Sequence, residues 1–282
     1  AATGSWVSTD GQYRALAASD CSFRTLENSA ACFDSHVALG LPDSPPLRPI
    51  AGEAADSRTT EIHRFELCAS VAEQINEGLR MYGATRHAEG RGIRRSNVGG
   101  YHSAEEVFHS SSSEWYGRFH NVLEEALRSV LPAGAEMPSV TGWINVSTAL
   151  AFNTLHDHGE VLWAAVYFVD AGELASGDET NEASAVAGSL LLKTQPKPWV
   201  AEYGYLPISP RAGDLWLFPG YMPHAVLPRA LHSPNVAKGG SATQCDTAMG
   251  RMRISVACNI FYRQHEGAEA NAERLMRLLI YG

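Results

Sequence analysis

The second half of the sequence predicts an antiparallel β-sandwich or barrel with helices before and after it, a mainly β fold. Short runs rich in β-branched and aromatic residues recur there and are separated by Gly, Pro, Asp and Asn. Apolar residues at helical spacing precede these runs. The expected strands are residues 141–147, 150–156, 161–169, 187–193, 213–218, 223–227 and 252–262.

Three helices are expected to flank the strands. Periodic apolar residues predict one helix over residues 61–82 and a second over 104–130, which ends before Pro132. A third is expected over residues 268–281. Residues 1–58, rich in Ala, Ser, Asp and Pro, are expected to form an irregular N-terminal lead-in, so that residues 59–282 form a single domain.

Composition and charge exclude several classes of protein. With 282 residues, of which 45% are hydrophobic, the chain can bury a large core. A net charge of -9 without a run of Lys or Arg argues against a nucleic-acid partner or an anionic membrane. No apolar window is long enough for a transmembrane helix. Five widely spaced cysteines without a CxxC pair favour reduced thiols in a soluble, intracellular (cytoplasmic) protein. The first residues, Ala-Ala-Thr-Gly, leave a cleaved leader open.

A cluster of metal-ligating residues lies at the start of an apolar strand. Side chains at i, i+2 and i+4 of an extended segment share a face, so His156, His158 and Glu160 can point the same way, with Asp157 opposite. Imidazole suits iron, zinc, copper and nickel, and two His with one carboxylate is typical of non-haem Fe(II) oxygenases. The alternative is a polar strand end without a metal.

Two downstream segments complete the candidate site. A turn at Gly213-Asp214 leads into an apolar strand, Pro-Gly ends it, and the next strand begins near His224, which would return this histidine to the first cluster. Farther on, Arg253 and Ser255 share a strand face. A guanidinium with a neighbouring hydroxyl matches a carboxylate, although Arg253 as an ordinary ion-paired residue stays open.

The substrate residues are the least specific part of the interpretation. The loop from Arg94 to Ser103 is polar and contains two adjacent glycines, so it either contacts a ligand or is simply solvated. Its Arg and Asn side chains and several aromatic residues of the strands are candidates for the pocket. These substrate candidates are Arg95, Asn97, Trp163 and Tyr221, with Tyr167 and Trp216 as further aromatic walls.

Taken together, the ordered motifs resemble the Fe(II)/2-oxoglutarate-dependent oxygenases. More narrowly, they are similar to a group of 2OG-Fe(II) oxygenases with a His-x-His motif. The matching pieces are Arg95-Ser-Asn-Val-Gly-Gly100, Trp143-Ile-Asn-Val146, Asn153-Thr-Leu-His-Asp-His158, Val166-Tyr-Phe-Val169, Gly213 through His224, and Arg253-Ile-Ser255 to Asn259. The resemblance covers roughly residues 60–263 and implies a double-stranded β-helix, or jelly roll, with a cupin-like shape.

The resemblance also implies a site and its ligands. Fe(II) would be bound by His156, His158 and His224, and the co-substrate 2-oxoglutarate by Arg253, Ser255 and Asn145. The wider superfamily uses His-x-Asp where this chain has His-x-His. Glu160 or Asp157 is therefore kept as the alternative carboxylate ligand. Residues 229–250 would be an insertion between His224 and Arg253.

The function implied is that of a dioxygenase which oxidises a small-molecule substrate with O2, by default through hydroxylation, and releases succinate and CO2. One rival is a cupin-type three-His dioxygenase or isomerase that does not use 2-oxoglutarate. A second rival is a non-catalytic, ligand-binding β-sandwich. The identity of the substrate and the oligomeric state do not follow from the sequence.

Overall fold

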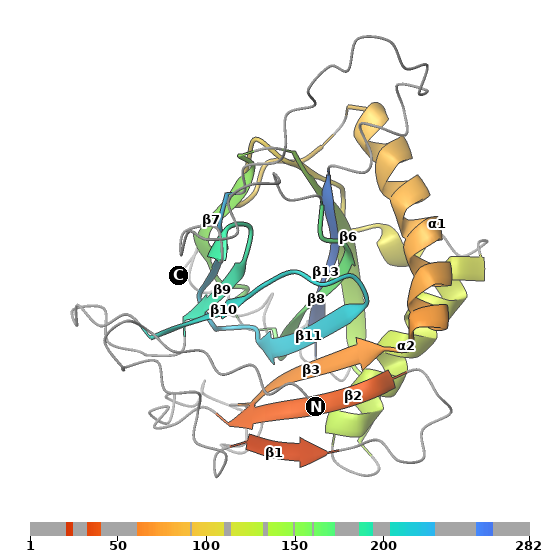
Figure 1. Ribbon diagram of the computed structural model, residues 1–282, viewed down its shortest axis with the longest axis vertical. Coiled ribbons are helices and arrows are strands. Elements are labelled where there is room, and N and C mark those ends of the chain that lie inside the picture. Colours follow the sequence, from red (N-terminus) through yellow and green to blue (C-terminus); the bar gives the residue numbers. More distant parts are fainter. Residues whose placement is uncertain are drawn as a thin grey trace, which may run out of the picture.

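The computed structural model describes residues 21–24, 33–40, 61–90, 92–109, 114–131, 135–148, 150–159, 161–172, 186–193, 204–228 and 252–261. Their strands form two sheets. Helices α1 (Ala69–Ala88) and α2 (Glu114–Val130) lie beside the larger sheet, on the side away from the smaller one (Figure 1). The space between the two sheets is therefore separate from the helical layer.

The larger sheet has eight strands in the order β1-β2-β3-β11-β8-β13-β6-β5, and the smaller has five in the order β10-β9-β12-β7-β4. Every strand pair is antiparallel. The strands of the larger sheet are β1 (Cys21–Arg24), β2 (Phe33–Gly40), β3 (Glu61–Leu67), β5 (Tyr101–His102), β6 (Ser139–Ser147), β8 (Trp163–Asp170), β11 (Asp214–Pro219) and β13 (Arg253–Phe261). Those of the smaller sheet are β4 (Asn97–Val98), β7 (Phe152–His156), β9 (Leu190–Lys193), β10 (Tyr205–Ile208) and β12 (His224–Val226).

The eight strands from β6 to β13 wind between the two sheets. β6, β8, β11 and β13 belong to the larger sheet, whereas β7, β9, β10 and β12 belong to the smaller. The chain therefore crosses from one sheet to the other repeatedly, and neighbours in each sheet come from distant parts of the sequence. This is the strand order of a double-stranded β-helix, so the predicted fold class is confirmed.

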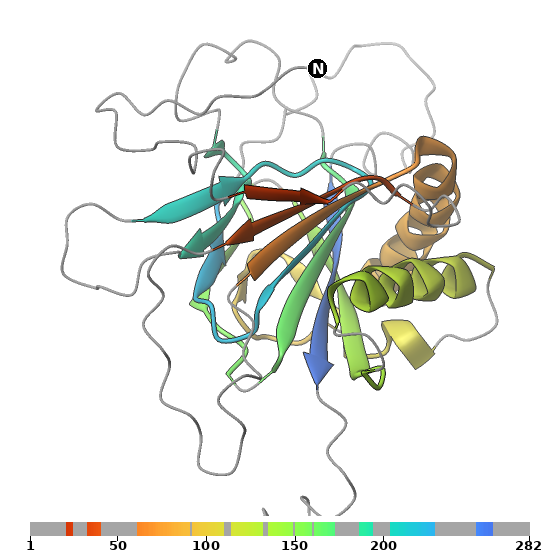
Figure 2. The ribbon, with the colours of Figure 1, turned by 90° about the horizontal axis from the view of Figure 1, so that it is seen from below.

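The main hydrophobic core lies between the larger sheet and the helices. One stripe of α2 faces it, and so does every second residue of β13. From α2 the buried residues are Phe119, Val122, Leu123, Ala126 and Leu127, and from β13 they are Ile254, Val256, Cys258 and Ile260. A smaller core lies between the two sheets and includes Phe168, Leu192 and Phe218. Figure 2 shows the helices on one side of the large sheet only.

The two helices pack closely because α1 carries a glycine at their contact. A Cβ atom on Gly78 would lie 2.2 Å from the ring of Trp115, which comes from the first turn of α2. Any larger residue would push the helices apart. The helical layer therefore depends on a small residue that helix propensity alone disfavours.

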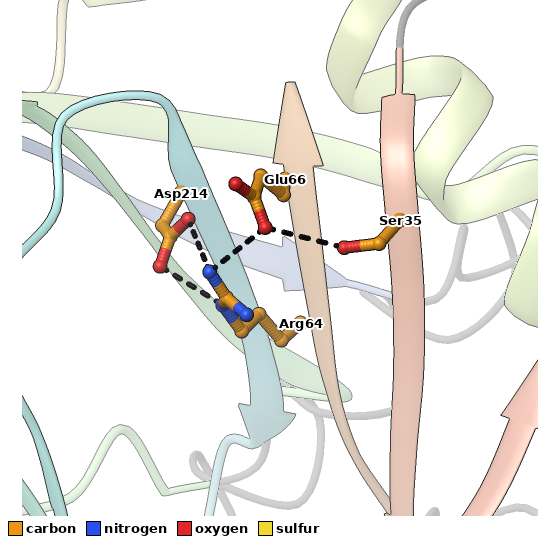
Figure 3. Close-up of polar contacts among 4 residues, drawn as sticks. All are labelled: Ser35, Arg64, Glu66 and Asp214. Carbon is orange, nitrogen blue, oxygen red and sulfur yellow. Dashed lines mark hydrogen bonds and ion pairs between the residues drawn. The ribbon is translucent and has the colours of Figure 1, made fainter. Parts of the chain in front are cut away.

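The predicted helix over residues 61–82 is wrong at its start, because Glu61–Leu67 is strand β3 and α1 begins at Ala69. Ile62 and Phe65 have the spacing of one helix face, but the segment forms a strand because β3 pairs with β2 on one side and with β11 on the other. Arg64 of β3 donates two hydrogen bonds of 2.9 Å to the buried carboxylate of Asp214 and one of 3.2 Å to Glu66 (Figure 3). Ser35 of β2 donates a hydrogen bond to the same Glu66. The ion pair of Arg64 with Asp214 and this hydrogen bond together connect β2, β3 and β11.

Other boundaries also differ from the predictions. The second helix begins at Glu114, since Val107–His109 forms a 3-10 turn instead. Strands β1 and β2 lie within residues 1–58, where an irregular lead-in was expected. Strands β4, β5 and β10 were not predicted. The predicted helix over 268–281 and the insertion over 229–250 lie outside the described residues.

Two further sequence expectations can be compared with the structure. Among the described helices, neither is both long and apolar enough to cross a membrane. Within the described residues, Cys68 and Cys258 are not part of a disulfide.

Candidate metal centre

His156 and His224 come together because they are register partners. His156 is the last residue of β7 and His224 the first residue of β12, and the antiparallel pairing of these strands places them opposite each other. The register of the two strands shifts between His224 and Val226. Two histidines separated by 68 positions in the sequence thus meet through strand pairing alone.

His158 joins them through a turn that contacts the β11–β12 connection. Its backbone N–H donates to the carbonyl of Gly220 at 2.8 Å. Gly220 itself is pressed against the chain just before β8, since a Cβ atom there would lie 2.2 Å from the carbonyl oxygen of Val161. Only glycine allows this approach. The Pro-Gly break seen in the sequence therefore fixes the position of His158 relative to His224.

The three imidazoles form a compact cluster. One ring nitrogen of each lies within 4.8 Å of those of the other two. The ring centroids of His156 and His224 are 4.3 Å apart, those of His158 and His224 are 4.9 Å apart, and those of His156 and His158 are 5.4 Å apart. The structure thus brings together all three histidines predicted from the sequence.

Each imidazole is held through Nδ1. The Nδ1 of His156 donates to the carbonyl of Thr154 at 2.7 Å, and that of His224 to the carbonyl of Met222 at 2.9 Å. The Nδ1 of His158 donates to the side-chain oxygen of Asn259. Because each of these partners accepts, Nδ1 carries the proton and Nε2 keeps its lone pair. An oxygen acceptor behind each ring is the usual support of a metal-binding histidine.

Burial keeps the three rings neutral. Loss of solvent lowers the pKa of His156 and of His158 below the ordinary value. It lowers the pKa of His224 most, to about 3, and the neighbouring His156 contributes in the same direction. A neutral imidazole with an unprotonated Nε2 is the form that binds a divalent metal ion, and the hydroxyl of Ser96, 3.2 Å from the Nε2 of His156, would have to give way there.

A cavity between the two sheets joins this cluster to Arg253. Its walls combine the histidines with polar residues of the larger sheet and apolar side chains from both sheets. The lining residues are Ser96, His102, Trp143, Asn145, Asn153, His156, His158, Ala164, Ala165, Val166, Phe168, Leu190, Phe218, His224, Val226, Arg253, Ser255 and Ala257. Arg253, Ser255 and Asn145, predicted as the co-substrate residues, are therefore in the same cavity as the histidines.

Arg253 is buried at the start of β13 and is held in place by hydrogen bonds. Its Nη1 donates to the carbonyl of Gly188 at 2.6 Å, and its Nη2 to the hydroxyl of Ser147 at 3.1 Å. The register pairs Arg253 with Ser147 and Ser255 with Asn145. Alternation along β13 places Arg253, Ser255 and Asn259 on the face toward the cavity, and Asn259 orients His158.

The alternative carboxylate ligands are not part of the described cluster. Asp157 is exposed, and its carboxylate accepts from the backbone N–H of Gly159 at 2.9 Å, where the chain turns with a positive φ. It follows the last residue of β7 and lies between His156 and His158, which both line the cavity. Glu160 lies outside the described residues.

The predicted substrate residues do not line the cavity. Trp163 is buried in the core on the helical side of β8, one residue out of phase with the cavity face. Arg95 is exposed, and Asn97 closes its own loop by accepting from the backbone of Arg95 and donating to the carbonyl of Gly100. Tyr221 is half-buried in the turn after Gly220. Of the other aromatic walls proposed, Tyr167 points to α1, where its hydroxyl contacts Asn76, and Trp216 is also absent from the lining.

Several site residues were not assigned a role from the sequence. Ser96 lies 3.2 Å from the Nε2 of His156 and accepts from Asn153 at 3.1 Å. His102 and Trp143 line the cavity, and Asn259 holds His158. Ser96, Trp143 and Asn259 fall within motifs that carried the resemblance, so their motif membership was the available signal.

A family model matches the central part of the sequence. Residues 141–236 match the model described as "Putative 2OG-Fe(II) oxygenase". The resemblance to the 2OG-Fe(II) oxygenases is thereby confirmed. The matched part of the sequence includes β6, β7, β8, β11 and β12, and with them His156, His158 and His224. The match does not test the narrower resemblance to the group with a His-x-His motif.

Several solved structures are similar to this chain at low identity. A prolyl-4-hydroxylase from Pseudomonas putida shares 16% identity, with 68% of this chain and 88% of that chain covered and a TM-score of 0.43. AviO1 from Streptomyces viridochromogenes Tue57 shares 10%, with 72% and 90% covered and a TM-score of 0.47. The carbocyclase SnoK from nogalamycin biosynthesis shares 13%, with 75% and 85% covered and a TM-score of 0.46. No curated protein matches the sequence.

Proposed function

We propose that the chain is an Fe(II)- and 2-oxoglutarate-dependent dioxygenase that hydroxylates a small molecule. The observation that carries the proposal is one cavity lined both by the three-histidine cluster and by Arg253. His156, His158 and His224 would hold Fe(II) through Nε2. Iron with 2-oxoglutarate, once bound, supplies the chemistry that converts O2 and the co-substrate into succinate, CO2 and an oxidised product.

The donor set fits a ferrous ion. Imidazole nitrogen is a suitable ligand for iron, and three protein ligands leave positions for a chelating co-substrate and O2. Three neutral histidines leave the 2+ charge of the ion intact, whereas a carboxylate ligand would reduce it. A dianionic co-substrate offsets that charge, so the loss of the usual carboxylate is compatible with binding of 2-oxoglutarate.

Arg253 is the proposed partner of the distal carboxylate of 2-oxoglutarate. Its guanidinium is buried and oriented by Gly188 and Ser147, so it can present a planar pair of donors at little entropic cost. The hydroxyl of Ser255 and the amide of Asn145 line the same cavity and would supply further hydrogen bonds. These residues bind and orient the co-substrate.

The apolar part of the lining excludes water from the histidines. Phe168, Leu190, Phe218 and Val226 line the cavity. The ring of Phe218 lies edge-on to His224, with centroids 4.9 Å apart. An apolar lining that excludes water would strengthen the electrostatic interactions of the bound ion and limit side reactions.

Anaerobic reconstitution with Fe(II), followed by addition of 2-oxoglutarate and O2, tests the proposal. We expect succinate to form in step with O2 consumption, slowly without substrate. Arg253→Lys should raise the KM for 2-oxoglutarate by about tenfold or more, because the bidentate contact is lost. Arg118→Lys, an exposed arginine paired with Glu114 on α2, is the matched control and should leave that KM unchanged.

A three-His dioxygenase that does not use 2-oxoglutarate is the second candidate. The observation that favours it is the absence of a carboxylate from the described cluster. Such an enzyme would bind Fe(II) and consume O2 with its substrate without forming succinate. If the chain binds no metal ion after reconstitution while His156, His158 and His224 are intact, a non-catalytic ligand-binding role is the better description.

A further inference from the structure

His102 is a fourth histidine in the cavity, outside the three-histidine cluster and on the opposite sheet. It lies at the end of β5, the edge strand of the larger sheet, and is 5% exposed. Its side chain lines the cavity together with the cluster and Arg253. The proposed function assigns it no role.

The hydrogen bonding of His102 determines which ring nitrogen is available. Nδ1 lies 2.6 Å from the carbonyl oxygen of Ser103, which can only accept, so Nδ1 carries the proton. In the neutral ring Nε2 is then an acceptor. Within the described part of the chain, Nε2 has no hydrogen-bond partner. Burial also favours the neutral ring, because it lowers the pKa of His102.

Stacking holds this acceptor beside the metal centre. The imidazole of His102 lies parallel to the indole of Trp143, with centroids 5.1 Å apart and planes at 11°. The same indole packs against His158, with centroids 5.7 Å apart. Trp143 thus contacts both His102 and His158, a proposed iron ligand, and links the position of His102 to the metal centre.

A second acceptor lies next to it. His102 is paired in register with Asn145 of β6, whose side-chain oxygen is buried and has no hydrogen-bond partner among the described residues. A buried acceptor without a donor is costly, and a ligand that supplies the donor recovers that cost. This end of the cavity therefore offers two acceptors, whereas the amide nitrogen of Asn145 stays available to the co-substrate.

We propose that His102 is a substrate-binding residue whose Nε2 accepts a hydrogen bond from a hydroxyl or N–H group of the substrate. This inference rests on the proposed function for the presence of a substrate in the cavity. The donor belongs to the substrate, because ionised 2-oxoglutarate and O2 carry no N–H or O–H group. An alcohol, phenol, amide or amine thus fits this end of the cavity better than an ester, ether or carboxylate.

Paired small probes test the inference on the full chain without added metal. We would measure binding by ligand-observed NMR for phenol against anisole, and for 2-pyrrolidinone against N-methyl-2-pyrrolidinone. In each pair only the first member carries a donor. We expect the donor-bearing member of at least one pair to bind about fivefold more tightly, the value of one net hydrogen bond. The pair that discriminates shows whether the group is a hydroxyl or an N–H.

Two substitutions locate the effect at Nε2. His102→Asn keeps an amide near the position of Nδ1 but removes Nε2, so the preference for donor-bearing probes should disappear. His102→Gln places an amide oxygen near the position of Nε2 and should retain the preference. Thermal unfolding checks that each variant is folded, and the wild-type comparison stands without them.

Equal binding of both members of each pair by the wild-type chain would overturn the inference. So would a preference that persists unchanged in His102→Asn. Because no iron or 2-oxoglutarate is present, these outcomes do not depend on the proposed reaction. Failure of the reaction itself is seen separately, as absence of succinate after reconstitution with Fe(II).

Discussion

The two faces of strand β13 have different surroundings: one is fully buried, and the other combines buried with half-buried residues. Ile254, Val256, Cys258 and Ile260 face the helices and contain no charged group. Arg253, Ser255 and Asn259 alternate with them and face the cavity or its histidines. Strand pairing on both sides, with β6 and β8, holds the two faces in a fixed relation.

The two faces of β13 contribute differently to folding stability and to ligand binding. The helical face is expected to carry most of the free energy of folding, because it buries the larger apolar cluster. The cavity face contains polar groups that burial disfavours and that a ligand would satisfy. Substitutions on the helical face should therefore change unfolding, and those on the cavity face should change binding.

The largest expected effect is in the core that α2 forms with the helix-facing side of β13. Phe119→Ala removes a fully buried ring that lies against Phe108 and Tyr167, with centroids 5.9 Å and 5.2 Å away. It should lower the free energy of unfolding by about 4 kcal/mol, measured by urea denaturation. Fe(II) affinity of the folded fraction should change less than twofold. Phe261→Ala, at the exposed end of β13, is the matched control and should cost much less.

The next effect is on the cavity face. His224→Ala removes the most buried ring of the cluster, and Fe(II) affinity should fall by more than about 100-fold, beyond the loss expected for a residue that only supports a ligand. Anaerobic metal titration measures it. His120→Ala, on the exposed surface of α2, should leave affinity unchanged. A His224→Ala chain that binds Fe(II) normally would contradict the proposed ligand set.

Asn259 tests whether the support of His158 matters. Asn259→Ala removes the oxygen that accepts from the Nδ1 of His158, and the ring is then free to turn. We expect Fe(II) affinity to fall by about tenfold, with little change in unfolding. Asn259→Asp keeps an acceptor and should retain most of the affinity. Similar affinities in Asn259→Ala and wild type would mean that the loop of His158 alone fixes its orientation.

The smallest expected effect is the contribution of His102 to the pH dependence of the free energy of unfolding. Its folded-state pKa is lowered, chiefly by burial and also by the charge of Arg95, although the hydrogen bond to the carbonyl of Ser103 acts in the opposite direction. Below the unfolded pKa, about 6.5, the unfolded chain binds a proton that the folded chain does not. The free energy of unfolding should therefore fall with pH until the lowered pKa is reached, by at most about 1.4 kcal/mol per pH unit.

The comparison with His102→Asn isolates this contribution. Between pH 7.5 and 5, about the range around the unfolded histidine pKa, the wild-type chain should lose stability faster than the variant. Denaturation of both chains at a series of pH values measures the difference. Parallel curves would indicate that His102 is protonated equally in both states.

The sequence alone determined the strand-rich second half and the three candidate ligands. Period-two alternation predicted that His156 and His158 share one face with Asp157 opposite, although β7 ends at His156 and His158 lies in the turn that follows. The Pro-Gly break predicted His224 at a strand start. These features are local, because the backbone geometry of a strand fixes which neighbours share a face. Side-chain alternation along β8 would also have placed Trp163 on the side away from the cavity, but the sequence does not show which face of β8 is inward.

Only the tertiary structure decided which face is inward and which strands are neighbours. The pairing of β3 with β11 turned an apparent helix into a strand, and the register of β7 with β12 set His156 opposite His224. His102 reached the cavity through the pairing of β5 with β6, from a loop for which the sequence left both ligand contact and simple solvation open. Each of these contacts joins residues far apart in the chain, where local periodicity carries no information and the packing of two sheets selects the partner.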